Sequence, residues 1–179
     1  LDCYILEPDR FGDDRGYFLE SYNQKTLREL GFDKIFVQDN ESKSKKGVLR
    51  GLHFQTKYTQ GKLVRCTFGK VLDIAVDLRK NSSTYGKWES AILDSDEKNM
   101  FYVPEGFAHG FLTLEDDTEF LYKCTNLYSP EHDSGLRWND PTINIDWKFE
   151  EFNITEEDLT ISDKDKVQQL FDKSSIYFE

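Results

Sequence analysis

The chain has 179 residues, of which 23 are Lys or Arg and 34 are Asp or Glu, so its formal net charge is −11. This excess of acid argues against a nucleic-acid-binding protein, because phosphate binding requires a basic surface. Aromatic residues make up 15 % of the chain, which argues against disorder, and no apolar run approaches the ~20 residues of a membrane span. We expect a single domain over residues 1–179, with no nucleic-acid or membrane partner.

The cysteine content favours a reducing compartment. Cys3, Cys66 and Cys124 are an odd number, and no two of them form a C-x-x-C pair. A disulfide framework or a zinc site is therefore disfavoured, and the simplest interpretation of Cys66 and Cys124 is that they are buried free thiols. We expect a cytoplasmic protein.

In chain order, residues 21–30 are predicted to form a helix that ends at Gly31. Strands then dominate, since residues 62–68, 70–79, 99–104 and 110–114 are rich in apolar residues and separated by turn material. Within 70–79, Leu72, Ile74 and Val76 share one face, whereas Asp73 and Ala75 share the other. Short strands at close spacing favour a sandwich, barrel or jelly roll. A second helix is predicted to start after Ser162 and to run through residues 167–173.

Four segments place polar side chains inside strand-like or capping sequence. Residues 47–55 hold Arg50 and His53, and a histidine is the most common general base because it titrates near neutrality. Residues 60–66 hold Lys62 and Arg65. Tyr122 and Tyr128 are six residues apart, so a continuous strand would turn both to the same face. The fourth segment, residues 160–166, includes Lys164 and Asp165; the simpler interpretation of Asp165 is that it completes a capping box.

A metal-binding interpretation rests on residues 104–109, where P-x-G-x-x-H ends at His109. This pattern is similar to the second half of the signature of cupins, which are metal-binding β-barrels. The first half, H-x-H followed by Glu, is absent, because His53 stands by itself and the third histidine is His132. We therefore predict a cupin-like barrel without a metal.

Taken together, these segments resemble the dTDP-4-dehydrorhamnose 3,5-epimerase family. RGLHFQ (50–55) and PEGFAHGFL (104–112) carry the resemblance, and FGDDRGYFLE, FVQDN, QGKLVRC, FLYKCTNLYSP and ISDKD follow the family order from about Glu7 to Asp165. The resemblance implies an all-β fold, a cupin-like jelly-roll β-barrel with a few short peripheral helices. It also implies a homodimer, no cofactor, and a nucleotide-diphosphate sugar as the substrate.

The resemblance further implies the reaction and its residues. A ketone at C4 acidifies the hydrogens on C3 and C5, so the site needs a base, a group that stabilises the enolate oxygen, and an acid on the opposite face. By resemblance His53 is the base, Asp165 orients and charges it, Lys62 lies near the oxyanion and Tyr122 donates the proton. Asp73 is the alternative partner of His53.

Substrate-binding residues are likewise carried over from the family. Tyr128 matches the aromatic residue that stacks on the base, and His109 matches a substrate-contacting position. The remaining binding positions match Arg15, Glu20, Gln38, Asp39, Asn40, Arg50, Asp133 and Lys164. The cations among them would supply the local positive charge that an anionic substrate requires in an acidic protein.

Several departures from the family pattern leave the substrate open. Residues 56–60, TKYTQ, replace a Pro-Pro stretch, and Glu41 and Leu127 stand where His and Tyr are common. A GDP-linked 6-deoxy-4-keto-heptose is an alternative substrate, and inversion at C3, at C5 or at both remains open. A sugar-binding jelly roll without catalysis and a metal-dependent cupin enzyme are the competing classes.

Overall fold

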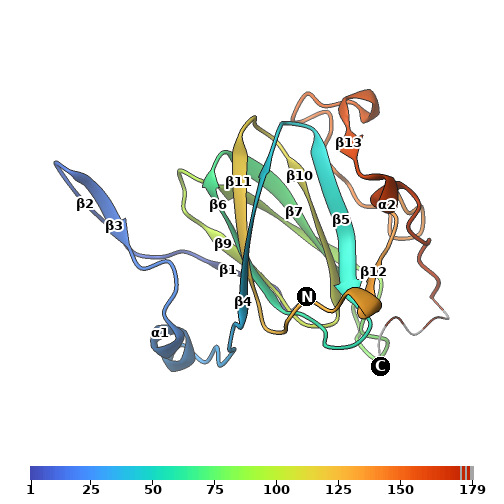
Figure 1. Cartoon of the computed structure of the whole chain (residues 1–179), viewed down its shortest axis with the longest axis horizontal. Coiled ribbons are helices and arrows are strands. Elements are labelled where there is room, and N and C mark those ends of the chain that lie inside the picture. Colours follow the sequence, from blue (N-terminus) through green and yellow to red (C-terminus); the bar gives the residue numbers. More distant parts are fainter. Residues whose placement is uncertain (174, 176, 178–179) are drawn as a thin grey trace.

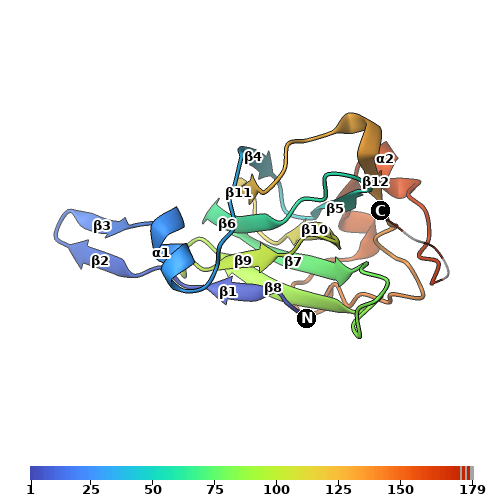
Figure 2. The same ribbon diagram turned by 90° about the horizontal axis from the view of Figure 1, so that it is seen from below.

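The computed structural model describes residues 1–173, 175 and 177. Within these residues the strands form two mainly antiparallel sheets and one separate hairpin. The two sheets face each other as a flattened barrel (Figures 1 and 2). The first sheet has the order β1 (Tyr4–Leu6), β9 (Met100–Val103), β6 (Lys62–Phe68), β11 (Thr118–Cys124) and β4 (Gln38–Ser44). The second has the order β12 (Asp133–Gly135), β5 (Val48–Gln55), β10 (Phe107–Thr113), β7 (Lys70–Asp77) and β8 (Trp88–Asp94), and β13 (Thr160–Ile161) lies parallel to β5.

The order of the strands explains the closed shape of the barrel. Along the chain, β4 belongs to the first sheet, β5 to the second, β6 to the first and β7 to the second, and the same alternation recurs from β9 to β12. Each sheet is therefore built from strands that are distant in sequence, as in a jelly roll. This confirms the predicted all-β jelly-roll fold with a few short helices.

Strand β7 separates two hydrophobic cores, as its alternating sequence predicts. Leu72, Ile74 and Val76 are fully buried on the outer face, where the C-terminal segment covers them through residues such as Trp147. Ala75 points to the inner face and packs in the barrel interior. The more apolar face of β7 thus lies outside the barrel, and its other face is available for polar residues within the barrel.

The two helices are short. Helix α1 (Gln24–Glu29) confirms the first predicted helix and its end before Gly31, whose φ is 86°. It begins three residues later than predicted, because Asn23 is its cap and accepts hydrogen bonds from the N–H groups of the first turn. Helix α2 (Asp163–Lys166) begins after Ser162 as predicted, but it stops at Lys166. The expected continuation through residues 167–173 is wrong, because this segment pairs and packs against the barrel, with Gln169 bridged to Leu136. Two 3-10 turns, η1 (Pro130–His132) and η2 (Glu156–Asp158), complete the helical elements of the described residues.

One element projects from the barrel. Strands β2 (Arg10–Asp13) and β3 (Gly16–Leu19) form a hairpin that extends away from both sheets (Figure 1). Its apolar side chains are exposed, with 65 % of Phe11, 56 % of Tyr17 and 69 % of Phe18 accessible. The hairpin therefore has little contact with the body of its own chain.

The remaining expectations for the fold concern thiols and membranes. The three cysteines are free, and Cys66 and Cys124 are buried, as predicted. Among the described residues, no helix has both the length and the apolar character needed to cross a membrane.

Candidate active site

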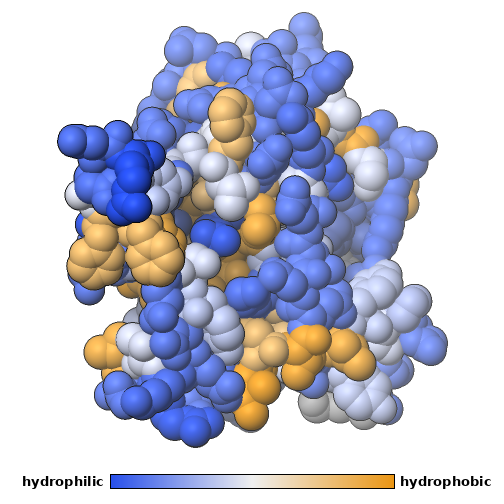
Figure 3. Space-filling model, turned by 60° about the vertical axis from the view of Figure 1, so that its left-hand side comes forward, coloured by the Kyte–Doolittle hydropathy of each residue, from blue (hydrophilic) through white to orange (hydrophobic). Residues whose placement is uncertain are grey.

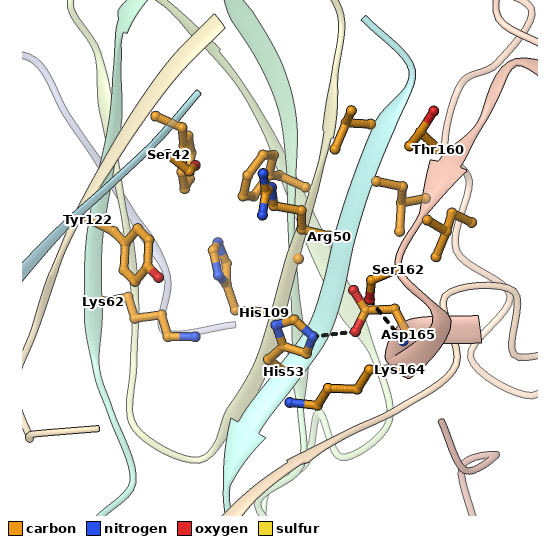
Figure 4. Close-up of a pocket in the computed structure, with 16 residues that line it drawn as sticks. Ser42, Arg50, His53, Lys62, His109, Tyr122, Thr160, Ser162, Lys164 and Asp165 are labelled. Atoms are coloured by element: carbon orange, nitrogen blue, oxygen red, sulfur yellow. Dashed lines mark hydrogen bonds and ion pairs between the residues drawn. The ribbon is translucent and has the colours of Figure 1, made fainter. Parts of the chain in front are cut away.

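A cavity of about 470 Å³ opens inside the barrel and is lined from both sheets and from α2. Apolar walls come from strand residues such as Phe111 and Phe120, whose rings stack at 4.1 Å. The labelled side chains of Figure 4 form the polar lining: Ser42, Arg50, His53, Lys62, His109, Tyr122, Thr160, Ser162, Lys164 and Asp165. The cavity thus gathers residues that are far apart in sequence.

An irregularity in β5 turns two of these residues to the same side. Opposite β5, His109 pairs with His53 and Phe111 with Arg50, so two steps along β10 match three steps along β5. This is a β-bulge, and it cancels the alternation that would place Arg50 and His53 on opposite faces. Gly51 permits it: its φ is 116°, and a Cβ atom there would lie 2.6 Å from the Cα atom of Gly110.

His53 is paired with Asp165. The distance from His53 Nε2 to Asp165 Oδ1 is 2.6 Å, and the Gly51 N–H donates to the other carboxylate oxygen. Burial by itself would raise the pKa of Asp165, but the hydrogen bonds with His53 and Gly51 bring this pKa below its usual value. The carboxylate is therefore kept ionised. Ser162 Oγ accepts from the Asp165 N–H, so the helix cap holds the backbone while the side chain turns to His53.

The simpler interpretation of Asp165 as a capping-box residue is therefore wrong for its side chain. Asp73, the alternative partner, is also placed elsewhere. It is fully buried, and its two carboxylate oxygens lie 3.0 and 2.9 Å from Nε2 of His109. The barrel therefore holds two His–Asp pairs, and His53 and His109 are directly opposite each other on neighbouring strands.

Lys62 and Tyr122 reach into the cavity from the side opposite His53 (Figure 4). Burial lowers the pKa of Lys62, and no hydrogen bond or ion pair to its ammonium group is found within the described part of the chain. Burial raises the pKa of the Tyr122 hydroxyl, which keeps it protonated at neutral pH. The cavity thus presents a cation and a hydroxyl donor across from a histidine.

A second hollow of about 340 Å³ adjoins the first and shares His53, Lys62, Tyr122 and Lys164 with it. Its other polar lining comprises Gln38, Asn40, Gln55, Gln60, Tyr128 and Asp133. Asp133 accepts a hydrogen bond from the Tyr128 hydroxyl at 2.9 Å and forms an ion pair with Lys164. The two hollows together form one elongated site.

The prediction that one continuous strand turns Tyr122 and Tyr128 to the same face is wrong. Strand β11 ends at Cys124, so the alternation that starts at Tyr122 does not continue to Tyr128. Tyr128 lies in the loop before η1 and is 53 % exposed. The loop nevertheless returns its ring to the second hollow, where the Gln38 side chain accepts from the Tyr128 N–H at 2.8 Å.

Three predicted binding residues lie outside both hollows of this chain. Arg15 occupies the turn of the β2–β3 hairpin, where its side chain is 90 % exposed and pairs with Asp13. Glu20 follows the hairpin and accepts hydrogen bonds from residues at the start of α1. Asp39 lies on β4 and forms an ion pair with Lys123 on the neighbouring strand.

The cavity also contains residues that the sequence did not indicate as candidates. Ser42 follows Gln38 and Asn40 on alternate positions of β4, and Phe111 follows His109 on β10, so extending the alternation would have found both. Thr160 has no such local signal, because its position depends on the parallel pairing of β13 with β5. Within residues 1–173, 175 and 177, no group of three His, Cys, Asp or Glu side chains is placed to hold a metal ion.

Sequence comparison connects this site with a family. The family model described as dTDP-4-dehydrorhamnose 3,5-epimerase matches residues 1–173. A dTDP-4-dehydrorhamnose 3,5-epimerase from Methanothermobacter thermautotrophicus is 51 % identical over 173 residues, which cover 97 % of this chain and 91 % of the relative.

Solved structures agree with the sequence matches. The dTDP-4-dehydrorhamnose 3,5-epimerase from Elizabethkingia anophelis superimposes with a TM-score of 0.89 at 50 % identity, covering 98 % of this chain and 94 % of that one. A dTDP-6-deoxy-D-glucose-3,5-epimerase from Legionella pneumophila, in complex with dTDP-4-keto-L-rhamnose, gives a TM-score of 0.87 at 46 % identity, with 94 % and 87 % covered.

Proposed function

Because this chain belongs to the dTDP-4-dehydrorhamnose 3,5-epimerase family, we propose that it epimerises a dTDP-linked 4-keto-6-deoxy sugar at the carbons beside the ketone. It is an isomerase. The ligand in the related Legionella pneumophila structure is a dTDP-4-keto sugar, which supports the dTDP-linked hexose over a GDP-linked heptose. The same relation supports catalysis over sugar binding alone.

The pairing of His53 with Asp165 carries the proposal. A general base must have a free nitrogen directed at the substrate and a partner that stabilises the positive charge it gains. Asp165 bonds Nε2 of His53 inside the cavity wall, which leaves Nδ1 as the nitrogen for the C–H proton. His53 thus removes the proton beside the ketone, and Asp165 stabilises the imidazolium that forms.

Lys62 and Tyr122 complete the proposed chemistry. When the proton leaves, negative charge develops on the ketone oxygen, and a preorganised cation in a water-poor cavity stabilises that charge. Lys62 is buried and has no protein partner among the described residues, so its ammonium group is available for this oxygen. Tyr122 lies across the cavity from His53 and is protonated, which suits a donor that returns the proton to the other face.

The adjoining hollow is proposed to hold the nucleotide. Tyr128 offers an aromatic face for the base, while Gln38 and Asn40 offer amide groups for its polar edge. Arg50 and Lys164 supply positive charge beside the cavity, where the diphosphate would lie. The sugar and the nucleotide would then occupy the two connected hollows of one elongated site.

The working form is proposed to be a homodimer. The β2–β3 hairpin exposes Phe11, Tyr17 and Phe18, and Figure 3 shows hydrophobic side chains beside a strongly hydrophilic cluster on the side from which it projects. A second copy of the chain is a suitable cover for such a surface. In this arrangement Arg15 and Glu20, which lie outside the hollows of their own chain, would complete the partner's substrate site.

The whole chain, residues 1–179, is proposed to act as one unit, since the cavity draws residues from Ser42 on β4 to Asp165 on α2. Free thiols at Cys3, Cys66 and Cys124 support a cytoplasmic location, because disulfides are rare in a reducing compartment.

The test is incubation in D₂O with dTDP-4-keto-6-deoxyglucose and, separately, with a GDP-linked 6-deoxy-4-keto-heptose, followed by NMR of each sugar carbon. We expect deuterium at C3 and C5 of the dTDP sugar.

The same experiment tests the base. His53→Ala should lower the exchange by about 10²–10⁴-fold, the usual size of general acid–base catalysis. His132→Ala is the matched control, because His132 lines neither hollow. Undiminished exchange in His53→Ala would refute the assigned base.

A further inference from the structure

The second His–Asp pair of the barrel has a defined arrangement of protons. Nε2 of His109 lies 3.0 and 2.9 Å from the two oxygens of Asp73. One N–H group directed between both oxygens of a carboxylate gives these two short distances together. A protonated carboxyl group would instead direct its single O–H at the nitrogen from one oxygen only. The geometry therefore places the proton on Nε2 and the negative charge on Asp73.

The other nitrogen of the His109 ring is open to the cavity. No hydrogen bond to Nδ1 is found in the described part of the chain, where the buried side-chain atoms without a partner are Ser42 Oγ, Thr113 Oγ1 and Arg137 Nε. Nδ1 of His109 is not one of these, so it has access to the cavity that His109 lines. Phe120 stacks nearly parallel to the imidazole, at 6.2 Å and 16°, and holds the plane of the ring.

The surrounding charges keep this imidazole neutral. Burial lowers the pKa of His109, the charge and hydrogen bond of Asp73 act to raise it, and the positive charge of Lys62 lowers it further. Burial raises the pKa of Asp73, while the hydrogen bond with His109 and the charge of Lys62 act to lower it, so the negative charge is placed on Asp73 by the two short distances and not by this pKa. A neutral imidazole with its proton on Nε2 has a lone pair on Nδ1, which is a hydrogen-bond acceptor.

We propose that Asp73 is a positioning residue of the epimerase site, which fixes His109 in the Nε2-protonated form so that Nδ1 accepts a hydrogen bond from a hydroxyl group of the sugar. This inference rests on the proposed function for the identity of the sugar. Lys62 and Tyr122 both offer protons to the substrate, whereas His109 accepts one. A hydroxyl group beside a reacting carbon is thereby held while its neighbour changes configuration.

The direct test is ¹⁵N NMR of the histidine side chains, which is practical because the chain has three histidines. His109→Gln identifies the His109 signals by their loss. In the wild-type protein we expect a neutral ring with its proton on Nε2. Adding dTDP-rhamnose, which lacks the ketone and cannot turn over, should shift Nδ1 while Nε2 stays hydrogen-bonded. A proton on Nδ1, or on both nitrogens, would overturn the proposal. So would an Nδ1 signal that does not respond to bound ligand.

A mutant cycle tests whether Asp73 acts through His109. Asp73→Asn removes the charge with little change of shape, and we expect it to redistribute the His109 proton and to lower kcat/KM about 10- to 100-fold, as for loss of a charged hydrogen bond. In the His109→Gln background the same change should cost less than about twofold. Glu89→Gln, an exposed carboxylate on the neighbouring strand β8, is the control and should leave the His109 signals unchanged.

If Asp73→Asn lowered kcat/KM by the same factor with and without His109→Gln, the two residues would act independently and the proposal would be overturned. If Asp73→Asn does not fold, the wild-type proton position and its response to dTDP-rhamnose decide the question. These NMR measurements need no turnover, so they are separate from the proposed function, which fails if the wild-type protein exchanges no deuterium into the 4-keto sugar.

Discussion

At the scale of single residues, burial gives neighbouring groups in the cavity different protonation states. The same loss of hydration lowers the pKa of Lys62 and raises that of Tyr122, because it disfavours an ammonium ion in one case and a phenolate in the other. Asp165 remains ionised because hydrogen bonds with His53 and the Gly51 N–H outweigh its burial. An ionised carboxylate and a protonated phenol therefore coexist in this cavity at neutral pH, and burial acts against the ammonium form of Lys62.

The assignment of Tyr122 as the acid predicts a separation of two steps. Tyr122→Phe keeps the ring and the cavity wall but removes the proton donor. We expect deuterium exchange to continue through His53, while formation of inverted sugar falls by about 10²-fold or more. NMR of the reaction in D₂O measures both processes at once.

Tyr4→Phe is the matched control for this experiment, since Tyr4 is 56 % exposed on β1, outside the cavity. If Tyr122→Phe slowed exchange and inversion equally, Tyr122 would be needed before the enolate forms, and the proposed division of roles between Tyr122 and His53 would be wrong.

At the scale of elements, the β2–β3 hairpin is the part least held by its own chain. Phe18→Glu places a charge on its exposed apolar surface. We expect the variant to sediment as a monomer at micromolar concentration and to lose most turnover, because Arg15 and Glu20 would no longer reach a partner. Leu170→Glu, on a partly exposed residue of the C-terminal segment, is the control and should stay dimeric. A wild-type monomer with full activity would contradict the proposal.

The end of β7 predicts a pH dependence of stability. The fully buried Asp77 accepts hydrogen bonds from Arg79, Ser82 and Thr84 at 2.9, 2.7 and 2.6 Å. Burial acts to raise its pKa, but these bonds lower the pKa to about 2. Because the folded pKa lies below that of the unfolded chain, this carboxylate stabilises the fold above about pH 4, and the contribution is lost as the pH falls toward 2.

Asp77→Asn should remove this part of the pH dependence, which amounts to about 2 kcal/mol of unfolding free energy between pH 5 and pH 2. Urea unfolding of both proteins at a series of pH values measures it. If the unfolding free energies of the wild type and of Asp77→Asn changed with pH in the same way, the hydrogen bonds to Asp77 would not favour its ionised form.

At the scale of the whole molecule, the C-terminal segment covers the outer face of the second sheet and also carries α2 with Asp165 to the cavity (Figure 1). Phe171 is 6 % exposed, its ring lies 5.3 and 5.4 Å from those of Tyr85 and Tyr177, and its N–H donates to Asp140 at 2.7 Å. This segment therefore links the stability of the outer core to the placement of Asp165 beside His53.

Phe171→Ala should lower the free energy of unfolding by about 3–5 kcal/mol, as is typical when a buried Phe leaves a cavity. Equilibrium urea unfolding measures this loss. Val167→Ala, on a residue that is 76 % exposed in the same segment, should change it by less than about 0.5 kcal/mol. A loss below about 1 kcal/mol in Phe171→Ala would mean that the segment is held mainly by other contacts.

The sequence by itself determined the local features and the family of this protein. Alternating residues in β7, the end of α1 at Gly31, the cap of α2 at Ser162 and the jelly-roll fold could all be predicted, because side-chain periodicity, capping chemistry and motif order are properties of neighbouring residues. The choice of His53, Lys62 and Tyr122 as candidates came from motifs. The structure brings these three side chains to one cavity.

The tertiary structure alone decided the pairing of these groups. Periodicity could not show that a bulge turns Arg50 and His53 to the same side, or that Tyr128 reaches the site from a loop after β11 has ended. It also could not choose between Asp165 and Asp73 as the partner of His53. That choice depends on which strands and segments lie side by side, and such contacts between distant residues are set by the packing of the whole chain rather than by any local pattern.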